Sequence, residues 1–304
     1  MDRIASMTTL LAAVEAGSFS AASRKLGMPL ATVSRKVSEL ETHLGTQLIT
    51  RTTRRLSLTD AGRAYVSACK KILEDIDEAE RAATGEFTAP RGNLTIAAPI
   101  VFGRLHVLPI VTEFLKSFPD INVRVALADR VVNLQEDGID LAIRIGDLPD
   151  SSLVAVRVGS IRRVVCASKD YFAKHGIPRT PADLSRHDCI TFEGLASPTG
   201  WNFAIEKSAV SVPIRSRLVV NTAEAAVDAA IAGIGVTRVL SYQIASALKE
   251  GKLHVALEEF ESAPSPVSLV HIGQGLLPLK LRAFLDFAAP RLKSRLARIQ
   301  EVKS

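Results

Sequence analysis

The sequence contains few cysteines, few aromatic residues and no long apolar run among its 304 residues. None of its three cysteines belongs to a CxxC pair, which argues against a disulfide framework or a zinc site. Burial as small apolar side chains is the expected role of Cys166 and Cys189, and redox sensing is the alternative. No segment approaches the roughly 20 apolar residues that cross a bilayer. We therefore predict neither a metal site nor a membrane span.

Sequence motifs of catalysis are absent as well. The chain has no HExxH, GxxxxGK[ST] or GxSxG motif, and Gly233-Ile234-Gly235 lacks the third glycine of a dinucleotide-binding fingerprint. Its six histidines have no short metal-ligand spacing. We predict no catalytic residue and no cofactor, and we expect that the protein is not an enzyme.

The first residues superficially resemble a signal peptide. Their apolar side chains instead recur at the spacing of an amphipathic helix, at Ile4, Met7, Leu10, Leu11 and Val14. Polar residues interrupt the continuous apolar run that export requires. We therefore expect a cytoplasmic protein.

Positive charge is concentrated in the first part of the chain and in its last residues. Residues 1–58 have a net charge of +4, and residues 59–88 have a net charge of −3. Residues 89–304 have a net charge of +5, of which four units lie in residues 291–304. The basic first part suits contact with phosphate, and the nearly neutral middle suits binding of a small molecule. The basic tail is interpreted as a solvated helix end.

Residues 19–38, FSAASRKLGMPLATVSRKVS, have the pattern of two short helices around a turn. Ser18 is the expected N-cap of the first helix, and Gly27 supplies the left-handed residue that ends it. The second helix starts near Leu30, and its apolar face is expected to contain Leu30, Val33, Val37 and Leu40. Its other face carries Ala31, Thr32, Ser34, Arg35 and Ser38. These side chains suit insertion into the major groove of DNA, although two solvated surface helices are the alternative.

A second pattern follows at residues 47–58, QLITRTTRRLSL. Two strand-like segments flank a polar tip, which predicts a β-hairpin wing whose cations reach phosphate or the minor groove. Thr59 can cap the next helix, and Asp60 lies at its positive end. The wing strengthens the DNA-binding interpretation.

The segments SFSAASRKLG, VSRKVSELETHLG and RTTRRLSLTDAG, in this order and spacing, resemble the DNA-binding domain of LysR-type transcriptional regulators. One departure is Pro29, where members of this family often have a Ser that caps the recognition helix. Because Pro is tolerated in the first helical turn, we expect this helix to form with a shifted or weaker start.

The resemblance implies that the chain binds double-stranded DNA. Arg35 and Ser34, helped by Ala31 and Thr32, are the expected base readers. Contacts with phosphate or the minor groove are expected from Ser18, Ser20, Arg51, Arg54 and Arg55. The expected target is an AT-rich interrupted palindrome near promoters, bound by a homodimer or homotetramer. RNA polymerase is a further partner that the resemblance allows.

Residues 59–84 form one long helical pattern with a stripe that steps by three and four. The stripe consists of Ala61, Tyr65, Ala68, Ile72, Ile76, Ala79 and Ala83. Because a lone helix would leave this stripe exposed, we predict that it pairs with its copy in a second chain. Packing against the chain's own core is the alternative. Gly85 and residues 88–92 are interpreted as a hinge.

Strand and helix patterns alternate after the hinge. Strands are predicted at 93–98, 121–127, 140–145, 153–158, 162–168 and 267–272, and helices at 104–118, 131–137, 223–232 and 279–287. Such alternation predicts an α/β fold with a parallel sheet covered by helices. The family resemblance divides this module into two lobes joined by two crossovers, similar to periplasmic solute-binding proteins.

We accordingly predict three parts in the chain. Residues 1–58 form a winged helix-turn-helix domain, residues 59–90 a linker helix and hinge, and residues 91–304 an effector-binding domain. Lobe I comprises residues 91–161 and 267–295, and lobe II comprises residues 162–266.

Ligands of such sheets bind beyond the carboxyl ends of the strands, at the cleft where two lobes meet. That rule nominates Pro99, Ile100, Val101, Phe102, Asp129, Arg144 and Ile145 from lobe I, and Thr199, Trp201, Asn221 and Thr222 from lobe II. Trp201 is the only Trp, and burial in the core is the commoner role of such a residue.

The first loop of this cleft also departs from the family. Many members have a Ser or Thr there that binds an effector carboxylate, whereas residues 98–101 read APIV. Apolar walls with one cation at Arg144 favour an aromatic or branched organic acid, unless the cleft binds little at all. The predicted function is therefore effector-responsive DNA binding. A solute-binding protein without a regulatory role is the alternative, against which the basic first domain and the missing export signal argue.

Overall fold

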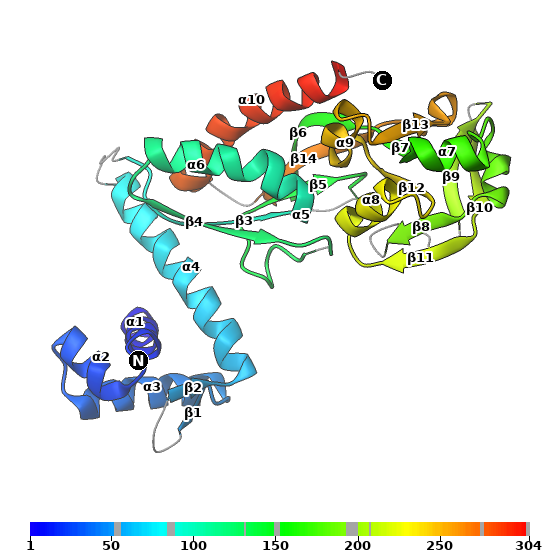
Figure 1. Cartoon of the computed structure of the whole chain (residues 1–304). Coiled ribbons are helices and arrows are strands. Elements are labelled where there is room, and N and C mark those ends of the chain that lie inside the picture. Colours follow the sequence, from blue (N-terminus) through cyan, green and yellow to red (C-terminus); the bar gives the residue numbers. More distant parts are fainter. Residues whose placement is uncertain are drawn as a thin grey trace. The chain divides into compact units, whose positions relative to one another are not determined.

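The computed structural model describes residues 1–51, 56–83, 89–130, 132–148, 153–192, 200–206, 208–273 and 277–301. The chain divides into two compact units (Figure 1). The first comprises residues 1–92 with residues 135–138, and the second comprises residues 93–134 with residues 139–304. Each unit is built around cores of its own.

The first unit is a small helical domain with a two-stranded wing. Its elements are α1 (Arg3–Glu15), α2 (Phe19–Leu26), α3 (Leu30–Leu44), β1 (Ile49–Arg51), β2 (Leu56–Leu58) and α4 (Asp60–Ala83). Strands β1 and β2 pair antiparallel. One core joins Leu10, Val37, Leu40 and Val66 from three helices, and a second joins Ala13, Ala22 and Val33. The cores fix α3 against α1 and α2 and leave its other face outside.

The expected apolar face of α1 is partly wrong. Ile4 is exposed, whereas Ser6 and Thr9 are buried beside Leu10. Both hydroxyls donate to main-chain carbonyl oxygens one turn earlier, at 2.8 Å from Ser6 to Asp2 and 2.6 Å from Thr9 to Ala5. Because these bonds satisfy the hydroxyls, the small polar side chains can occupy positions that periodicity assigned to larger apolar ones.

The second unit contains two five-stranded sheets. The first sheet has the order β4 (Ile121–Leu127), β3 (Gly92–Ala98), β5 (Leu141–Ile145), β14 (Ser265–Ile272) and β6 (Leu153–Ile161). It is covered by α5 (Ile100–Phe102), the π-helical turn η1 (Gly103–Val107), α6 (Leu108–Ser117) and α10 (Leu279–Glu301). Phe114 of α6 and Phe284 of α10 meet edge to face in the core of this sheet.

The second sheet has the order β11 (Ser216–Val220), β8 (Cys189–Phe192), β12 (Val236–Leu240), β7 (Arg163–Ser168) and β13 (Leu253–Ala256). Alternate residues of β7 enter two different cores, as strand geometry requires. One core contains α7 (Lys169–His175) and the paired strands β9 (Gly200–Ile205) and β10 (Ser208–Pro213). The other contains α8 (Ala223–Ile231) and α9 (Ala245–Lys249). The 3₁₀ helices η2 (Pro181–Arg186), η3 (Ser241–Gln243) and η4 (Glu258–Phe260) complete the unit.

The predicted parallel pairing holds only for part of each sheet. Strands β3 and β5 are parallel, but β14 is antiparallel to both β5 and β6. In the second sheet, β7 is antiparallel to β12 and β13. Strands β7 and β14 each follow a crossover from one sheet to the other, so a helical connection within one sheet does not set their direction.

Two predicted helices also differ. The prediction of a helix at 131–137 is wrong. Residues 134–138 instead form a turn, which the Ile139 N–H closes by donating to the Leu134 carbonyl oxygen. Val131 lies outside the described residues. Helix α10 continues past its predicted end through Pro290 to Glu301. Among the described helices, none is both long and apolar enough to cross a membrane.

The three cysteines are buried and reduced. Burial raises the pKa of the Cys166 and Cys189 thiols to about 12, so both remain protonated at neutral pH. Both side chains belong to the cores of the second sheet. Their packing explains these residues better than redox chemistry does.

Candidate nucleic-acid interface and effector site

Helix α3 begins abruptly after a well-formed turn. The Ser18 hydroxyl accepts a hydrogen bond from the Ala21 N–H at 3.2 Å, and Gly27 adopts φ of 62°, so α2 begins and ends as predicted. Pro29 makes no side-chain cap, and its carbonyl oxygen accepts from the N–H groups of Thr32 and Val33 instead. The helix therefore starts at Leu30 without the usual hydroxyl cap.

The outer face of α3 carries small and polar side chains. Ala31 and Arg35 are exposed, Thr32 and Ser34 are half-buried, and Val33 lies in the core on the opposite face. Arg35 has 71% of its side chain exposed, and its Nε lies 3.7 Å from Glu39 Oε1. An ion pair that is so exposed is weak, so the guanidinium can turn to another acceptor.

One residue assigned to the apolar face of α3 is misplaced. Leu30 is 48% exposed, whereas Val33, Val37 and Leu40 are fully buried. Leu30 is the first residue of the helix, where the neighbouring elements no longer cover it. It therefore extends the outer face rather than the core.

The predicted phosphate contacts are described only in part. Ser18, the N-cap of α2, and Ser20, in its first turn, are both exposed. The Ser18 hydroxyl accepts within the cap and keeps its own proton to donate. Arg54 and Arg55 lie outside the described residues, as does the side chain of Arg51. For these three residues the DNA contact stays a prediction.

The base of the wing is joined to both neighbouring helices. Glu41 of α3 accepts from the N–H groups of Leu48 and Ile49 at 2.9 and 3.0 Å. Thr59 caps α4 as predicted, accepting from the Gly62 N–H at 2.9 Å, and it also donates to the Gln47 carbonyl oxygen at 2.7 Å. These bonds set the direction in which the wing leaves the domain.

Gly62 is a positioning residue that the sequence did not reveal. A Cβ at this position would lie 1.9 Å from the Leu48 carbonyl oxygen, so only glycine allows α4 to approach the wing so closely. Glu41 was missed in the same way. Both lie in segments quoted for the family resemblance, but their roles depend on contacts across the fold.

Helix α4 has two distinct faces. Val66 and Cys69 are buried in the first unit. Tyr65 packs partly against the same core. The other members of the predicted stripe are more accessible, with Ala61 and Ala68 exposed, Ile72 43% exposed and Ile76 half-buried. The side chains of Ala79 and Ala83 are outside the described part. Most of the described stripe is therefore not used by the chain's own core.

In the second unit, the loop after β3 turns directly into a helix. Pro99 and Ile100 are half-buried, but Val101 and Phe102 are buried in the core of the first sheet. The Ile100 N–H donates to the Asp129 carboxylate at 3.0 Å. A carboxylate of the chain itself therefore binds the first N–H of this turn. The side chains of Val101 and Phe102 fill the core, and their contact with a ligand stays a prediction.

Arg144 is also bound by the chain itself. It lies in β5, half-buried, and its guanidinium donates to the Val132 carbonyl oxygen. Burial lowers its pKa, since removal from water disfavours the charged form. Its neighbour Ile145 is half-buried. A ligand carboxylate at Arg144 would share the guanidinium with Val132 or displace it.

The residues nominated from the second sheet have different fates. Trp201 is 1% exposed and packs with Phe203 in a core, which is the commoner role of such a residue, and its ligand contact stays a prediction. Thr222 caps α8 by accepting from the Ala225 N–H at 3.3 Å, and Asn221 is exposed before it. Thr199 lies outside the described residues.

Apart from Phe102, the residues that form contacts between the two sheets were not nominated from the sequence. Arg104 donates to Glu224, in the first turn of α8, at 2.8 Å. The ring of Tyr242 lies 5.4 Å from Phe102 and 5.5 Å from His106, centroid to centroid. Burial lowers the pKa of His106 to about 4, so this imidazole is neutral at pH 7. An aromatic cluster thus joins η1 and η3.

Two family models match the chain. The model described as "Bacterial regulatory helix-turn-helix protein, lysR family" matches residues 4–63, and the model described as "LysR substrate binding domain" matches residues 88–293. Together they cover the recognition helix, the wing and both sheets of the second unit.

Similar proteins are regulators along nearly the whole length. An HTH-type transcriptional repressor of Pseudomonas aeruginosa is 35% identical, over 94% of this chain and 91% of the relative. The HTH-type transcriptional activator AaeR of Escherichia coli is 31% identical, over 94% of this chain and 93% of the relative. The structure of CrgA, a LysR-type transcriptional regulator from Neisseria meningitidis, is 30% identical with a TM-score of 0.61, and the match covers 94% of this chain and 98% of that chain.

Proposed function

The chain belongs to the LysR family of bacterial transcriptional regulators, and we propose how it binds DNA and to which ligand it responds. It is a DNA-binding transcriptional regulator with an effector-binding domain. The observation that carries the proposal is the outer face of α3, which presents Ala31 and Arg35 to solvent. The solute-binding alternative is not favoured, because the relatives are regulators over nearly their whole length.

In the proposed complex, α3 lies in the major groove. Arg35 donates to a guanine edge, with Ser34, Ala31 and Thr32 contacting neighbouring bases. Ser18 and Ser20 donate to phosphate, and Arg51, Arg54 and Arg55 of the wing reach phosphate or the minor groove. The net charge of +4 on residues 1–58 favours such binding.

We propose that two copies pair along α4. The accessible positions Ala61, Ala68, Ile72 and Ile76 support this, because a helix that leaves such a stripe outside its own core can bury it against a copy. A dimer presents two α3 helices, and two such helices require two half-sites. The proposed target is therefore an interrupted palindrome near promoters. A homotetramer would bind two such sites, and RNA polymerase is the proposed further partner there.

The proposed effector is an aromatic or branched organic acid. Pro99, Ile100 and Ile145 supply apolar contact, and Arg144 supplies a half-buried cation that a carboxylate can bind in place of the Val132 carbonyl oxygen. Asn221 and Thr222 lie at the start of α8, where N–H groups favour an anion.

Because the DNA target is chromosomal, we place the protein in the cytoplasm.

Genomic footprinting tests this function directly. The chain is cross-linked to DNA in cells that express it, and protected fragments are sequenced. We expect enrichment of promoter-proximal sites that share two half-sites of opposite orientation, about one or two helical turns apart. Protected fragments without a common sequence would contradict sequence-specific regulation. The genes beside the enriched sites then indicate which acids to screen.

A further inference from the structure

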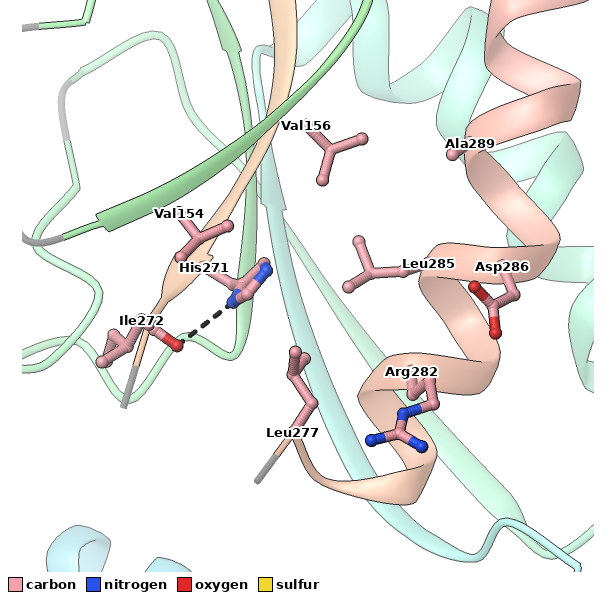
Figure 2. Close-up of a pocket in the computed structure, with 10 residues that line it drawn as sticks. Val154, Val156, His271, Ile272, Leu277, Arg282, Leu285, Asp286 and Ala289 are labelled. Carbon is pink, nitrogen blue, oxygen red and sulfur yellow. Dashed lines mark hydrogen bonds between the residues drawn. The ribbon is translucent and has the colours of Figure 1, made fainter. Parts of the chain in front are cut away.

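A groove lies on the first sheet of the second unit, between α10 and the paired strands β6 and β14 (Figure 2). It has a volume of about 440 Å³, which is in the range of pockets that hold small organic ligands. No residue nominated for effector binding is among those that line it. The groove is therefore distinct from the predicted cleft.

Short apolar side chains create the groove. Val154 and Val156 of β6 and Leu285 and Ala289 of α10 point towards the same space (Figure 2). Farther along, α10 and β6 are in close contact. A Cβ added to Gly159 of β6 would lie 2.7 Å from Leu296 Cδ1 of α10. Close packing at one end and small side chains at the other leave room for a flat apolar group.

His271 forms a fixed wall of this groove. It is 2% exposed, and its Nδ1 lies 3.1 Å from the Ile272 carbonyl oxygen (Figure 2). Since a carbonyl oxygen can only accept, Nδ1 carries the proton of this bond. The bond holds the ring in place, so this part of the wall is rigid.

Arg282 supplies a cation beside the apolar walls. Within the described part of the chain, no carboxylate lies within 4.0 Å of its guanidinium, and this includes Asp286 in the next turn of α10. A guanidinium binds a carboxylate through two parallel hydrogen bonds. Asp286 also lines the groove and would repel a second negative group.

We propose that this groove is a second ligand site, for an aromatic acid with a single carboxylate. The ring lies on Val156 and Leu285, and the carboxylate binds Arg282. The volume suits one such ring, Arg282 complements the one charge, and Asp286 selects against a dicarboxylate. The site does not depend on the effector proposed for Arg144, and both can be occupied together.

Titration calorimetry of the full chain with phenylacetate tests the proposal. Acetate keeps the carboxylate but lacks the ring, and 2-phenylethanol keeps the ring but lacks the charge. We expect saturable binding of phenylacetate that is at least about tenfold tighter than that of either analogue, because each lacks one of the two contacts. Equal binding of all three, or no binding of phenylacetate, would overturn the proposal.

Variants locate the binding. Arg282→Gln should weaken phenylacetate binding at least about tenfold, whereas Arg298→Gln, an exposed Arg on the same helix outside the groove, should leave it unchanged. Val154→Phe narrows the groove from a residue that is 43% exposed, so the fold tolerates it while affinity falls. Arg144→Gln removes any phenylacetate that binds in the cleft, whereas the binding that depends on Arg282 should remain.

The opposite pattern distinguishes this site from the proposed effector site. If Arg144→Gln removed phenylacetate binding and Arg282→Gln did not, the acid would lie in the cleft, which would overturn the groove proposal and support the effector proposal. Sedimentation of Val154→Phe tests whether a second copy of the chain covers the groove. A lower mass than that of the wild type would mean that it does, and would also overturn the groove proposal.

Discussion

The two units present their candidate residues in opposite ways. In the first unit, Ala31 and Arg35 are exposed on α3, and the ion pair of Arg35 with Glu39 is weak. In the second unit, two polar candidates are already bonded within the chain, Asp129 to the Ile100 N–H and Arg144 to the Val132 carbonyl oxygen. The proposed DNA-binding face of α3 is therefore open to a partner, whereas an effector at the proposed site would compete with these internal bonds. That competition can couple ligand binding to a change in the second unit.

Gly62→Ala should cause the largest loss of stability, and this loss should be confined to the first unit. The new Cβ would meet the Leu48 carbonyl oxygen, so α4 and the wing cannot keep their present approach. We expect the first unit to lose about 3 kcal/mol of stability or more, together with specific DNA binding. Calorimetric unfolding should show the transition of the second unit at an unchanged temperature.

Ala64→Ser, on an exposed position of the same helix, is the matched control and should change neither transition. If Gly62→Ala also left both transitions unchanged, the tight joint between wing and α4 would be absent in solution.

Replacing Ile72 and Ile76 together with Asp should separate the dimer into monomers. Two copies would otherwise bury like charges in the seam between their α4 helices. Sedimentation reports the mass, and the double variant Ile72→Leu with Ile76→Leu should keep the dimer. An unchanged mass of the Asp variant would mean that another interface suffices.

The sequence predicted the first unit well because its signals are local. Ser18, Gly27 and Thr59 act on groups within a few residues, and all three adopt the expected capping or turn roles. The assignment of Leu30 to the apolar face was wrong, because helical periodicity does not reveal where the covering elements end. Gly62 and Glu41 were missed because their partners lie across the fold.

In the second unit the strands were predictable from apolar runs, but their directions and partners were not. The antiparallel direction of β14 depends on a connection between the two sheets, which no local pattern encodes. The strand-end rule nominated Val101, Phe102 and Trp201, yet packing placed all three in cores. His106 and Tyr242 meet only through the tertiary fold.

Arg144→Ala should remove the thermal stabilisation that an effector acid provides. A ligand at a hundredfold excess over its Kd stabilises the native state by about 2.7 kcal/mol. A melting screen of organic acids on the wild-type chain identifies the ligand, and the variant should lose that shift while DNA binding remains. A shift that survives in Arg144→Ala would place the acid elsewhere.

Acidification should weaken the second unit by a smaller amount. The pKa of His106 is lowered to about 4 in the fold, against about 6.5 when unfolded, so its contribution is present above pH 6.5 and is lost as the pH falls towards 4. We expect a loss of about 2 kcal/mol over this range. His106→Phe, which retains an aromatic ring beside Tyr242, should flatten the pH dependence in denaturant titrations. An unchanged slope would mean that other groups titrate instead.

The central claim is that α3 reads bases, and titration of Arg35→Ala on two DNA duplexes tests it most directly. One duplex carries the footprinted site and the other its scrambled sequence. We predict that affinity for the true site falls by about 1–3 kcal/mol while affinity for the scrambled duplex is nearly unchanged, because a base contact carries sequence information. An equal loss on both duplexes would show that Arg35 binds phosphate and would contradict the claim.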